Sequence, residues 1–332
     1  MMAETHIEEA APAGSRRWLW LLIGAALLIL AAPLFPVFLT DVPDWLIAPL
    51  SDWVGRALEW FARDAGIGGV TVAQITRAIA AGAEKPIEWL SMLLAEGWVS
   101  GAGFNKVQLA PPLSWLGVML ATALLAWRLS GRGLAALTLL AGSYLAFFGL
   151  WASAMITLAS VLLSVLTALA LGLAIGIRAY RSPGTEAAVR AIMNVMQTVP
   201  IFSYLLPTLL LFGYGPSAAL FATVVYALPP MVHATVLALR SVPAESLELA
   251  RMTGCNRVQT LWKVELPVAV PRLAIGLNQV VMMTLNMVII ASMIGAGGLG
   301  YDVLRALRRL DFGTGFEAGM GIVALAVVLD RL

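Results

Sequence analysis

Long apolar runs alternate with short polar segments along most of this chain. A helix needs roughly 20 apolar residues to cross the hydrocarbon layer of a membrane. The pattern therefore predicts an all-α integral membrane protein with about eight transmembrane helices. The eight runs are Trp18–Leu39, Pro112–Trp127, Gly133–Trp151, Ala154–Ile177, Ile201–Gly213, Ser217–Leu239, Ala269–Met293 and Phe316–Leu329. Proline residues within some of these runs predict kinked or broken helices.

The segments outside this pattern predict the organisation of the chain. Residues 1–15 are polar and rich in Ala, which predicts a disordered cytoplasmic tail. Residues 16–39 form an extra N-terminal transmembrane helix, too long for a signal peptide and without a clear cleavage site. Residues 40–110 interleave Trp with charged residues, as amphipathic helices at the periplasmic membrane surface do. Two transmembrane helices follow in 111–149, and a membrane core follows in 150–332.

Composition excludes several classes of protein. Apolar residues make up 60% of the chain, charged residues only 12%, and the mean hydropathy is +0.88, so lipid must solvate part of the surface. The net charge of +2 is too small to predict nucleic-acid binding. A single cysteine, Cys255, excludes an internal disulfide and a cysteine-built metal site. With only His6 and His233 as histidines, we expect no catalytic residues and no metal.

The distribution of Lys and Arg predicts the orientation in the membrane. Most of them fall in the loops that become cytoplasmic when Arg16 and Arg17 are placed inside. Arg305, Arg308 and Arg309 violate the rule. Eight crossings then place both termini in the cytoplasm.

The polar segment Ser241–Pro271 predicts a helix–turn–helix on the cytoplasmic side. Pro243 and Glu245 suit the first turn of a helix, and Gly254 suits a left-handed cap at its end. Asn256 and Gln259 have the spacing of a capping box for a second helix. That helix is predicted to end at Pro267 and to carry one apolar stripe of Val258, Leu261 and Trp262. A solvated loop is the plainer alternative.

This segment resembles the cytoplasmic loop of binding-protein-dependent ABC importer permeases. Their pattern is E-A-A, three residues, G, nine residues, then I-x-L-P. The chain has Glu248-Leu249-Ala250, Gly254 and Val264-Glu265-Leu266-Pro267, with Leu249 and Val264 as mild departures. The resemblance implies a type I ABC importer transmembrane fold in which residues 241–268 form a coupling loop that docks on an ATPase subunit. Its candidate residues are Glu248, Ala250, Gly254, Val264, Leu266 and Pro267.

Further stretches are similar to permeases for quaternary-amine solutes such as glycine betaine, proline betaine and choline. These are Met196–Pro200, Ala291–Gly300, Arg309-Leu310-Asp311 and Leu329–Leu332. The resemblance implies a bacterial inner-membrane subunit without enzymatic activity, working as a homodimer with two ATPase subunits and a periplasmic binding protein. ATP binds to the partner, so this chain holds no cofactor. Trimethylamine oxide, carnitine and methionine stay open as alternative substrates.

Five residues are candidates for the translocation pathway. Asn278 and Asn286 lie eight residues apart on one face of a predicted helix, and their alternative role is hydrogen bonding between helices. Phe202 and Tyr204 follow Pro200 and could contact a cationic ammonium, with packing as their alternative role.

The stretch Gly295-Ala296-Gly297-Gly298-Leu299-Gly300 satisfies the G-x-G-x-x-G pattern of nucleotide-binding folds. It follows a predicted membrane helix rather than a strand, so closely packed backbone at the outer end is the better interpretation. A secondary transporter or channel is the competing class. It would require charged residues near the bilayer midplane, and the apolar runs are nearly free of them.

Overall fold

The structure is a computed structural model that describes residues 15–30, 47–67, 69–100 and 107–332. The chain divides into two units, Met1–Leu58 and Glu59–Leu332. Most of the predicted tail and the second part of the first apolar run, 31–39, lie outside the described residues. In the first unit, α1 (Ser15–Leu30) is an apolar helix whose side chains from Trp18 onward are exposed.

Residues 47–110 contain two helices with segregated polar and apolar faces, α2 (Leu50–Arg63) and α3 (Val72–Ser91). A capping box between Thr71 and Gln74 begins α3, and a π-helical turn, η3 (Met92–Glu96), follows it. α3 packs across α6 (Trp151–Arg181), α8 (Leu205–Phe212) and α9 (Pro216–Arg240). Ile87 is buried there, and the Thr76 hydroxyl donates to the Leu211 carbonyl at 2.5 Å. Two short antiparallel pairs, β1 (Gly66–Ile67) with β2 (Val70–Thr71) and β3 (Trp98–Ser100) with β4 (Val107–Ala110), were not predicted.

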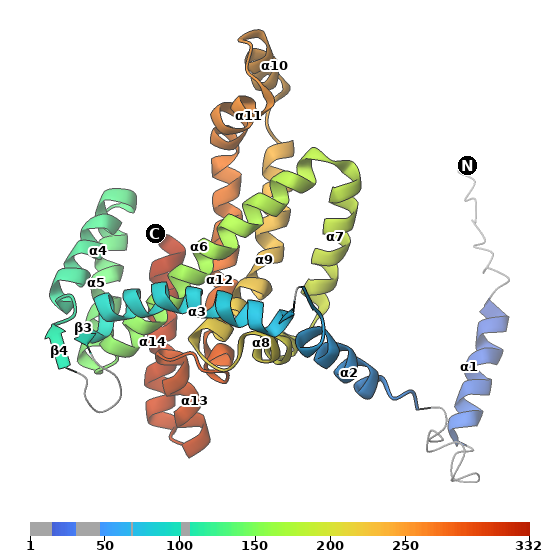
Figure 1. Cartoon of the computed structure of the whole chain (residues 1–332), viewed down its shortest axis with the longest axis horizontal. Helices are drawn as coiled ribbons and strands as arrows, with labels where there is room; N and C mark the ends of the chain where they lie inside the picture. Colours follow the sequence, from blue (N-terminus) through green and yellow to red (C-terminus); the bar gives the residue numbers. More distant parts are fainter. Residues whose placement is uncertain (1–14, 31–46, 68, 101–106) are drawn as a thin grey trace, which may run out of the picture. The chain divides into compact units, whose positions relative to one another are not determined.

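Three long helices form the centre of the second unit: α6 (Trp151–Arg181), α9 (Pro216–Arg240) and α12 (Leu266–Ser292) (Figure 1). Glycines let their backbones approach closely, as in other membrane helix pairs. A Cβ at Gly172 or Gly176 would lie 2.5 Å from Met231 or Thr235 of α9. A Cβ at Gly276 of α12 would lie 2.3 Å from that of Ala234. A larger residue at any of these positions would separate the helices.

Three further apolar helices flank this centre. α4 (Trp115–Ser130) and α5 (Arg132–Phe147) pack against each other, and α5 also contacts α14 (Phe312–Arg331). Leu145, Met155, Leu299 and Leu325 share a buried cluster that joins these helices to α6 and α13 (Leu299–Arg309).

The number of long spans among the described residues is smaller than the eight predicted. Four helical stretches are long and apolar enough to cross a membrane: Trp151–Arg181, Pro216–Arg240, Arg257–Ser292 and Phe312–Arg331. A bent pair of helices brings the number to five. Trp18–Leu30, α4 and α5 are apolar but shorter. Each of the last two rises only about 24 Å.

The bent pair corrects the expected crossing at 201–213. The residues before it, expected as an inner loop, form α7 (Pro183–Thr198). A short turn, η5 (Ile201–Tyr204), and the eight-residue α8 (Leu205–Phe212) follow at 115° to α7. Val199 is extended because a residue before proline avoids the helical region, so Pro200 ends α7. Alone, α8 is far too short to span.

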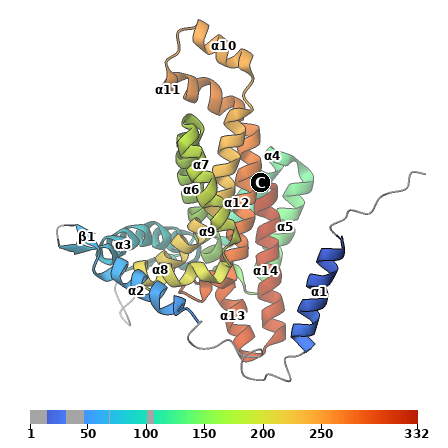
Figure 2. The same ribbon diagram turned by 90° about the vertical axis from the view of Figure 1, so that its right-hand side faces the viewer.

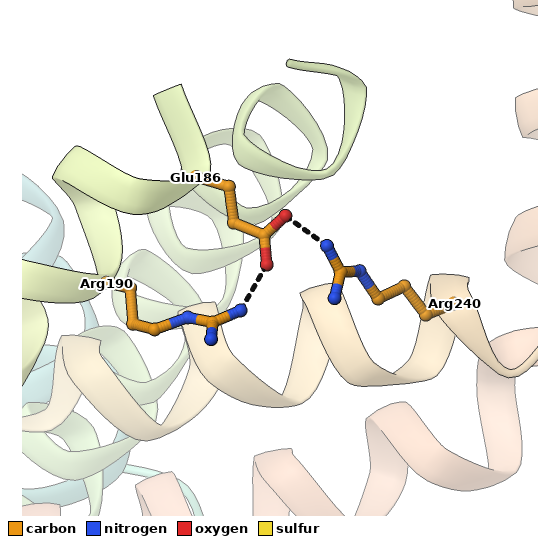
Figure 3. A network of polar contacts seen from close by, with 3 residues as sticks. All are labelled: Glu186, Arg190 and Arg240. Atoms are coloured by element: carbon orange, nitrogen blue, oxygen red, sulfur yellow. Dashed lines mark hydrogen bonds and ion pairs between the residues drawn. The ribbon is translucent and has the colours of Figure 1, made fainter. Parts of the chain in front are cut away.

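A buried carboxylate ties α7 to α9. Glu186 of α7 is 7% exposed and accepts hydrogen bonds from the guanidinium groups of Arg190 on the same helix and Arg240 at the end of α9 (Figure 3). The two arginines stay half exposed. These ion pairs explain how a helix with several polar residues packs against the central bundle.

The Gly-rich stretch joins α12 to α13 (Leu299–Arg309). It lies at the end of the bundle away from residues 241–268 (Figure 2). Gly295 and Gly298 have φ angles of +109° and +80°. Gly295 packs on Gly215, whose N–H donates to the Ile294 carbonyl at 3.0 Å, and the Thr157 hydroxyl accepts from the Leu299 N–H at 2.9 Å. The expected close packing of backbone is therefore present.

We expect Gly298→Ala to destabilise the fold by at least about 2 kcal/mol, because its left-handed backbone disfavours a side chain. The new Cβ would also lie 2.3 Å from the Thr157 hydroxyl. Thermal unfolding of the purified protein measures this. The matched control is Gly297→Ala, whose Cβ would lie 3.5 Å from Ile156. Equal stability of the two variants would contradict the packing described.

Glu186→Gln should lower the free energy of unfolding by about 1–2 kcal/mol, since two half-exposed guanidinium groups lose their shared carboxylate. Asp302→Asn serves as the control because its contact with Arg305 is long, at 3.8 Å. It should shift the melting temperature much less. A larger effect from Asp302→Asn would count against a structural role for Glu186.

Candidate functional site

The segment predicted as a helix–turn–helix projects beyond the ends of α6 and α9 (Figures 1 and 2). Its first helix, α10 (Ala244–Met252), begins after Pro243 and has Glu245 in its first turn. Its second helix, α11 (Arg257–Thr260), starts four residues after Thr253. We call residues 241–268 the knob. Its two helices confirm the predicted shape and exclude a plain solvated loop.

Hydrogen bonds at the turn of the knob fix its geometry. Gly254 has a φ of +73°, its N–H donates to the Arg251 carbonyl at 3.0 Å, and the Cys255 N–H donates to the Ala250 carbonyl at 2.9 Å. This is the Schellman arrangement that glycine favours. The Asn256 side chain accepts from the Val258 and Gln259 N–H groups, while the Gln259 side chain accepts from the Asn256 N–H. Both predicted caps are thus confirmed.

The expectation that the second helix ends at Pro267 is wrong. The helix continues through a π-helical turn, η6 (Leu261–Glu265), directly into α12. Proline lacks an N–H, and its ring clashes with the carbonyl four residues earlier. The wide turn, in which the Leu266 N–H donates to the Leu261 carbonyl, accommodates that clash. The second helix of the knob and the membrane-spanning helix α12 are therefore one continuous helix.

Buried apolar contacts hold the base of the knob on two other helices. Leu261 is 4% exposed and packs with Ala238, Leu239 and Val242 at the end of α9. The same cluster includes Ile177 and Tyr180 of α6, together with Leu247 and Leu266 of the knob. Because close-packed interiors transmit displacement, a force on the knob reaches α6, α9 and α12 together.

The outer surface of the knob exposes apolar side chains. Leu249, Met252, Val258 and Trp262 are all more than half exposed. Only Leu261 of the predicted stripe faces inward, so the stripe is divided between the base and the outer surface.

Of the candidate coupling residues, Glu248 and Pro267 are exposed, Val264 and Leu266 are half-buried, and Ala250 is buried. An exposed apolar surface of this kind is typical of a protein contact site.

Asn278 and Asn286 lie on one face of α12, as predicted, and both are exposed. Ile275, Met282 and Ile289 share that face and are also exposed. We call this the open face of α12. Exposed amide groups on a membrane-spanning helix favour contact with water or with another helix over contact with lipid.

The other three pathway candidates lie at the turn η5 and differ in their surroundings. The Tyr204 hydroxyl donates to the Met196 carbonyl, and its ring lies edge-on to Tyr226 at 5.9 Å. Phe202 is exposed, and Pro200 precedes the turn η5. In this structure Tyr204 has the packing role that was its alternative.

The fold brings together two groups of polar residues that sequence spacing does not predict. Glu186, Arg190, His233 and Arg240 line a cavity of about 300 Å³ between α7 and α9. A second cavity of about 30 Å³ lies next to the Gly-rich stretch. Its lining includes the hydroxyl residues Thr157, Ser160, Ser164, Thr223 and Thr284. Both groups assemble from distant parts of the chain, which spacing alone does not reveal. Among the described residues, no cluster of three His, Cys, Asp or Glu could hold a metal ion.

The motif Arg309-Leu310-Asp311 forms the turn between α13 and α14. Leu310 has a φ of +54°, and the Asp311 carboxylate accepts from the Thr314 hydroxyl at 2.8 Å and from its N–H at 3.1 Å. These hydrogen bonds lower the pKa of Asp311 below its usual value. The motif therefore caps α14.

Comparison with known proteins identifies a family and several relatives of this chain. Residues 168–332 match the family model described as binding-protein-dependent transport system inner membrane component. The glycine betaine/proline betaine transport system permease protein ProW of Escherichia coli is 37% identical over 286 residues, 86% of this chain and 74% of that protein. The glycine betaine permease protein OpuAB of Bacillus subtilis is 36% identical, covering 75% of this chain and 90% of the relative.

A trimethylamine N-oxide permease protein, TmoV of Ruegeria pomeroyi, is 35% identical over 99% of this chain but only 49% of its own length. The chain thus spans about half of that relative. Inward-facing structures of the MetNI methionine ABC transporter match with TM-scores of 0.48 and 0.47 at 23% and 25% identity. They cover 52% and 54% of this chain and 87% and 88% of the solved chains.

The alignment with the Escherichia coli protein covers 74% of that protein, and its 286 residues extend well beyond the knob and the Gly-rich stretch. The long apolar helices make the chain a multi-pass membrane protein. It belongs to the family of inner-membrane components of binding-protein-dependent transport systems, as a transport subunit.

Proposed function

We propose that this chain is the permease subunit of an ATP-driven importer for a small quaternary-amine solute such as glycine betaine, proline betaine or choline. The knob carries the proposal, because it is a rigid projection joined without a break to a membrane-spanning helix. The names of the Escherichia coli and Bacillus subtilis relatives support the substrate class. Trimethylamine oxide, carnitine and methionine are the alternative solutes.

An ATPase subunit binds to the exposed apolar surface of the knob. Two ATPases serve two copies of the permease, since one chain carries one knob. When ATP draws the ATPases together, the knob moves, and its buried base displaces α6, α9 and α12 with it. Glu248 supplies a polar contact, Gly254 the turn, and Leu266 with Pro267 the joint to α12. The nucleotide stays on the ATPase.

A soluble binding protein delivers the solute to the side opposite the knob. Arg178, Arg181 and Arg240 lie at the ends of α6 and α9 near the knob, and under the positive-inside rule they support a cytoplasmic knob. Both termini are proposed to lie on the same side. The open face of α12 meets a second copy of the chain across a water-lined pathway, where Asn278 and Asn286 replace water around the solute. Alternating exposure of that pathway transports the solute.

We expect Gly254→Val to abolish solute uptake while leaving membrane insertion intact. A β-branched residue at a φ of +73° strains the turn by roughly 1–2 kcal/mol and re-aims the two helices. Uptake of labelled glycine betaine into vesicles, with the ATPase and binding protein present, measures the effect.

Gly254→Asn is the matched control, because asparagine adopts the left-handed conformation and a Cβ here meets open space. It should keep most of the transport. Normal uptake by Gly254→Val would contradict the coupling role of the knob.

The purified complex should contain two permease chains and two ATPases by native mass measurement. Its ATPase rate should rise with binding protein loaded with a quaternary amine. Titrating that binding protein with glycine betaine, choline, carnitine, trimethylamine oxide and methionine identifies the solute. Preference for methionine would overturn the substrate class, and a chain that transports without an ATPase would overturn the importer itself.

A further inference from the structure

A large cavity lies at the base of the knob, between it and the end of α6. Its volume is about 760 Å³, which is in the range of small-molecule sites. Three segments line it: the end of α6 and, more than 60 residues later in the chain, the helix α10 and the stretch from Cys255 to Glu265. Its lining residues are Tyr180, Arg181, Leu247, Arg251, Cys255, Arg257, Thr260 and Glu265.

The charge of this lining is strongly unbalanced. Arg181, Arg251 and Arg257 contribute three positive charges, and Glu265 is the single acid among the lining residues. None of the three arginines has an ion pair in the part of the chain that the structure describes. Arg190 and Arg240, by contrast, share Glu186. The cavity therefore holds guanidinium donors that the described residues do not use.

Helix dipoles account for only part of this arrangement. Arg181 and Arg251 lie in the last turns of α6 and α10, where a positive charge is favourable. Arg257 is the first residue of α11, where a positive charge opposes the dipole. A bound anion would offset that unfavourable charge and would use the donors of all three arginines.

We propose that this cavity binds a phosphate group, which joins the end of α6 to the knob. Guanidinium groups match phosphate oxygens bidentately, and three of them line this cavity. The cavity lies where α6 and α12 leave the proposed membrane-spanning region, which is the depth of lipid headgroups. A headgroup phosphate and free inorganic phosphate share this chemistry. Its consequence for coupling rests on the proposed function, but phosphate binding itself does not.

The first test uses the full chain, purified with its ATPase where one is bound, in detergent. Its melting temperature is followed during titration with inorganic phosphate and, at equal ionic strength, with chloride. Binding to the folded state raises the melting temperature with concentration. Arg181→Gln and Arg257→Gln should each weaken the phosphate effect about tenfold or more, since each removes a charged donor.

Arg178→Gln is the matched control for Arg181→Gln. Both arginines lie in the last turn of α6 and are exposed, but Arg178 does not line the cavity. It should leave the phosphate effect unchanged. Lys263→Gln plays the same part for Arg257, because Lys263 is close in sequence, exposed and outside the lining.

The second arm separates the two sources of phosphate. The same variants are placed in nanodiscs of phosphatidylcholine with or without phosphatidylglycerol, and retained lipid is counted by native mass spectrometry. Retention of phosphatidylglycerol that is lost in Arg181→Gln and Arg257→Gln assigns the site to a headgroup. An effect of inorganic phosphate alone assigns it to a soluble phosphate.

Equal behaviour of the cavity variants and the two controls in both arms would overturn the proposal. Loss of the ATPase from Arg257→Gln without any change in phosphate or lipid binding would also overturn it, and would assign the arginines to acidic groups of that partner. Because binding is measured without transport, its failure is distinguishable from failure of the proposed importer function.

Discussion

The close approach of α6, α9 and α12 is the constraint on which the rest of the structure depends. Gly172 and Gly176 admit Met231 and Thr235, and Gly276 admits Ala234, at distances that no side chain at the glycine would permit. With the three backbones in contact, none of the helices can shift alone. The second helix of the knob continues into α12, and the base of the knob packs on α6 and α9. The knob is therefore a rigid projection rather than a flexible loop.

The two ends of this bundle use different chemistry. At the knob end, arginines meet a buried carboxylate in one place and line a basic cavity in another. At the opposite end, glycines and hydroxyl groups let the chain between α12 and α13 pack against α6 and α9. Ion pairs there would need desolvation, whereas Thr157 can accept from a backbone N–H without carrying a charge.

Local chemistry was predictable from the sequence, and long-range chemistry was not. The caps at Gly254 and Asn256 depend on residues within a few positions of each other, so the spacing was enough. Pro267 normally stops a helix, but the π turn at 261–265 lets the helix continue, and no local signal marks that turn. The residues of α7 lie between two predicted apolar runs, so the pattern predicted a loop there. The ion pair that holds this helix on the bundle joins Glu186 to Arg240, 54 residues later. The face that exposes Asn278 and Asn286 was predictable from helical spacing, whereas their pathway role remains a proposal.

The distribution of charge also limits how energy can enter the transport cycle. Arg240 is the last residue of α9, and α12 has no charged residue after Arg272. An ion-coupled carrier needs a titratable or ion-binding group near the midplane, within the moving helices. After Arg272 the polar side chains of α12 are three amides and two hydroxyls, which carry no charge: Asn278, Gln279, Thr284, Asn286 and Ser292. In the proposed importer, work reaches these helices from outside the membrane through the knob, which continues into α12 and packs on α6 and α9.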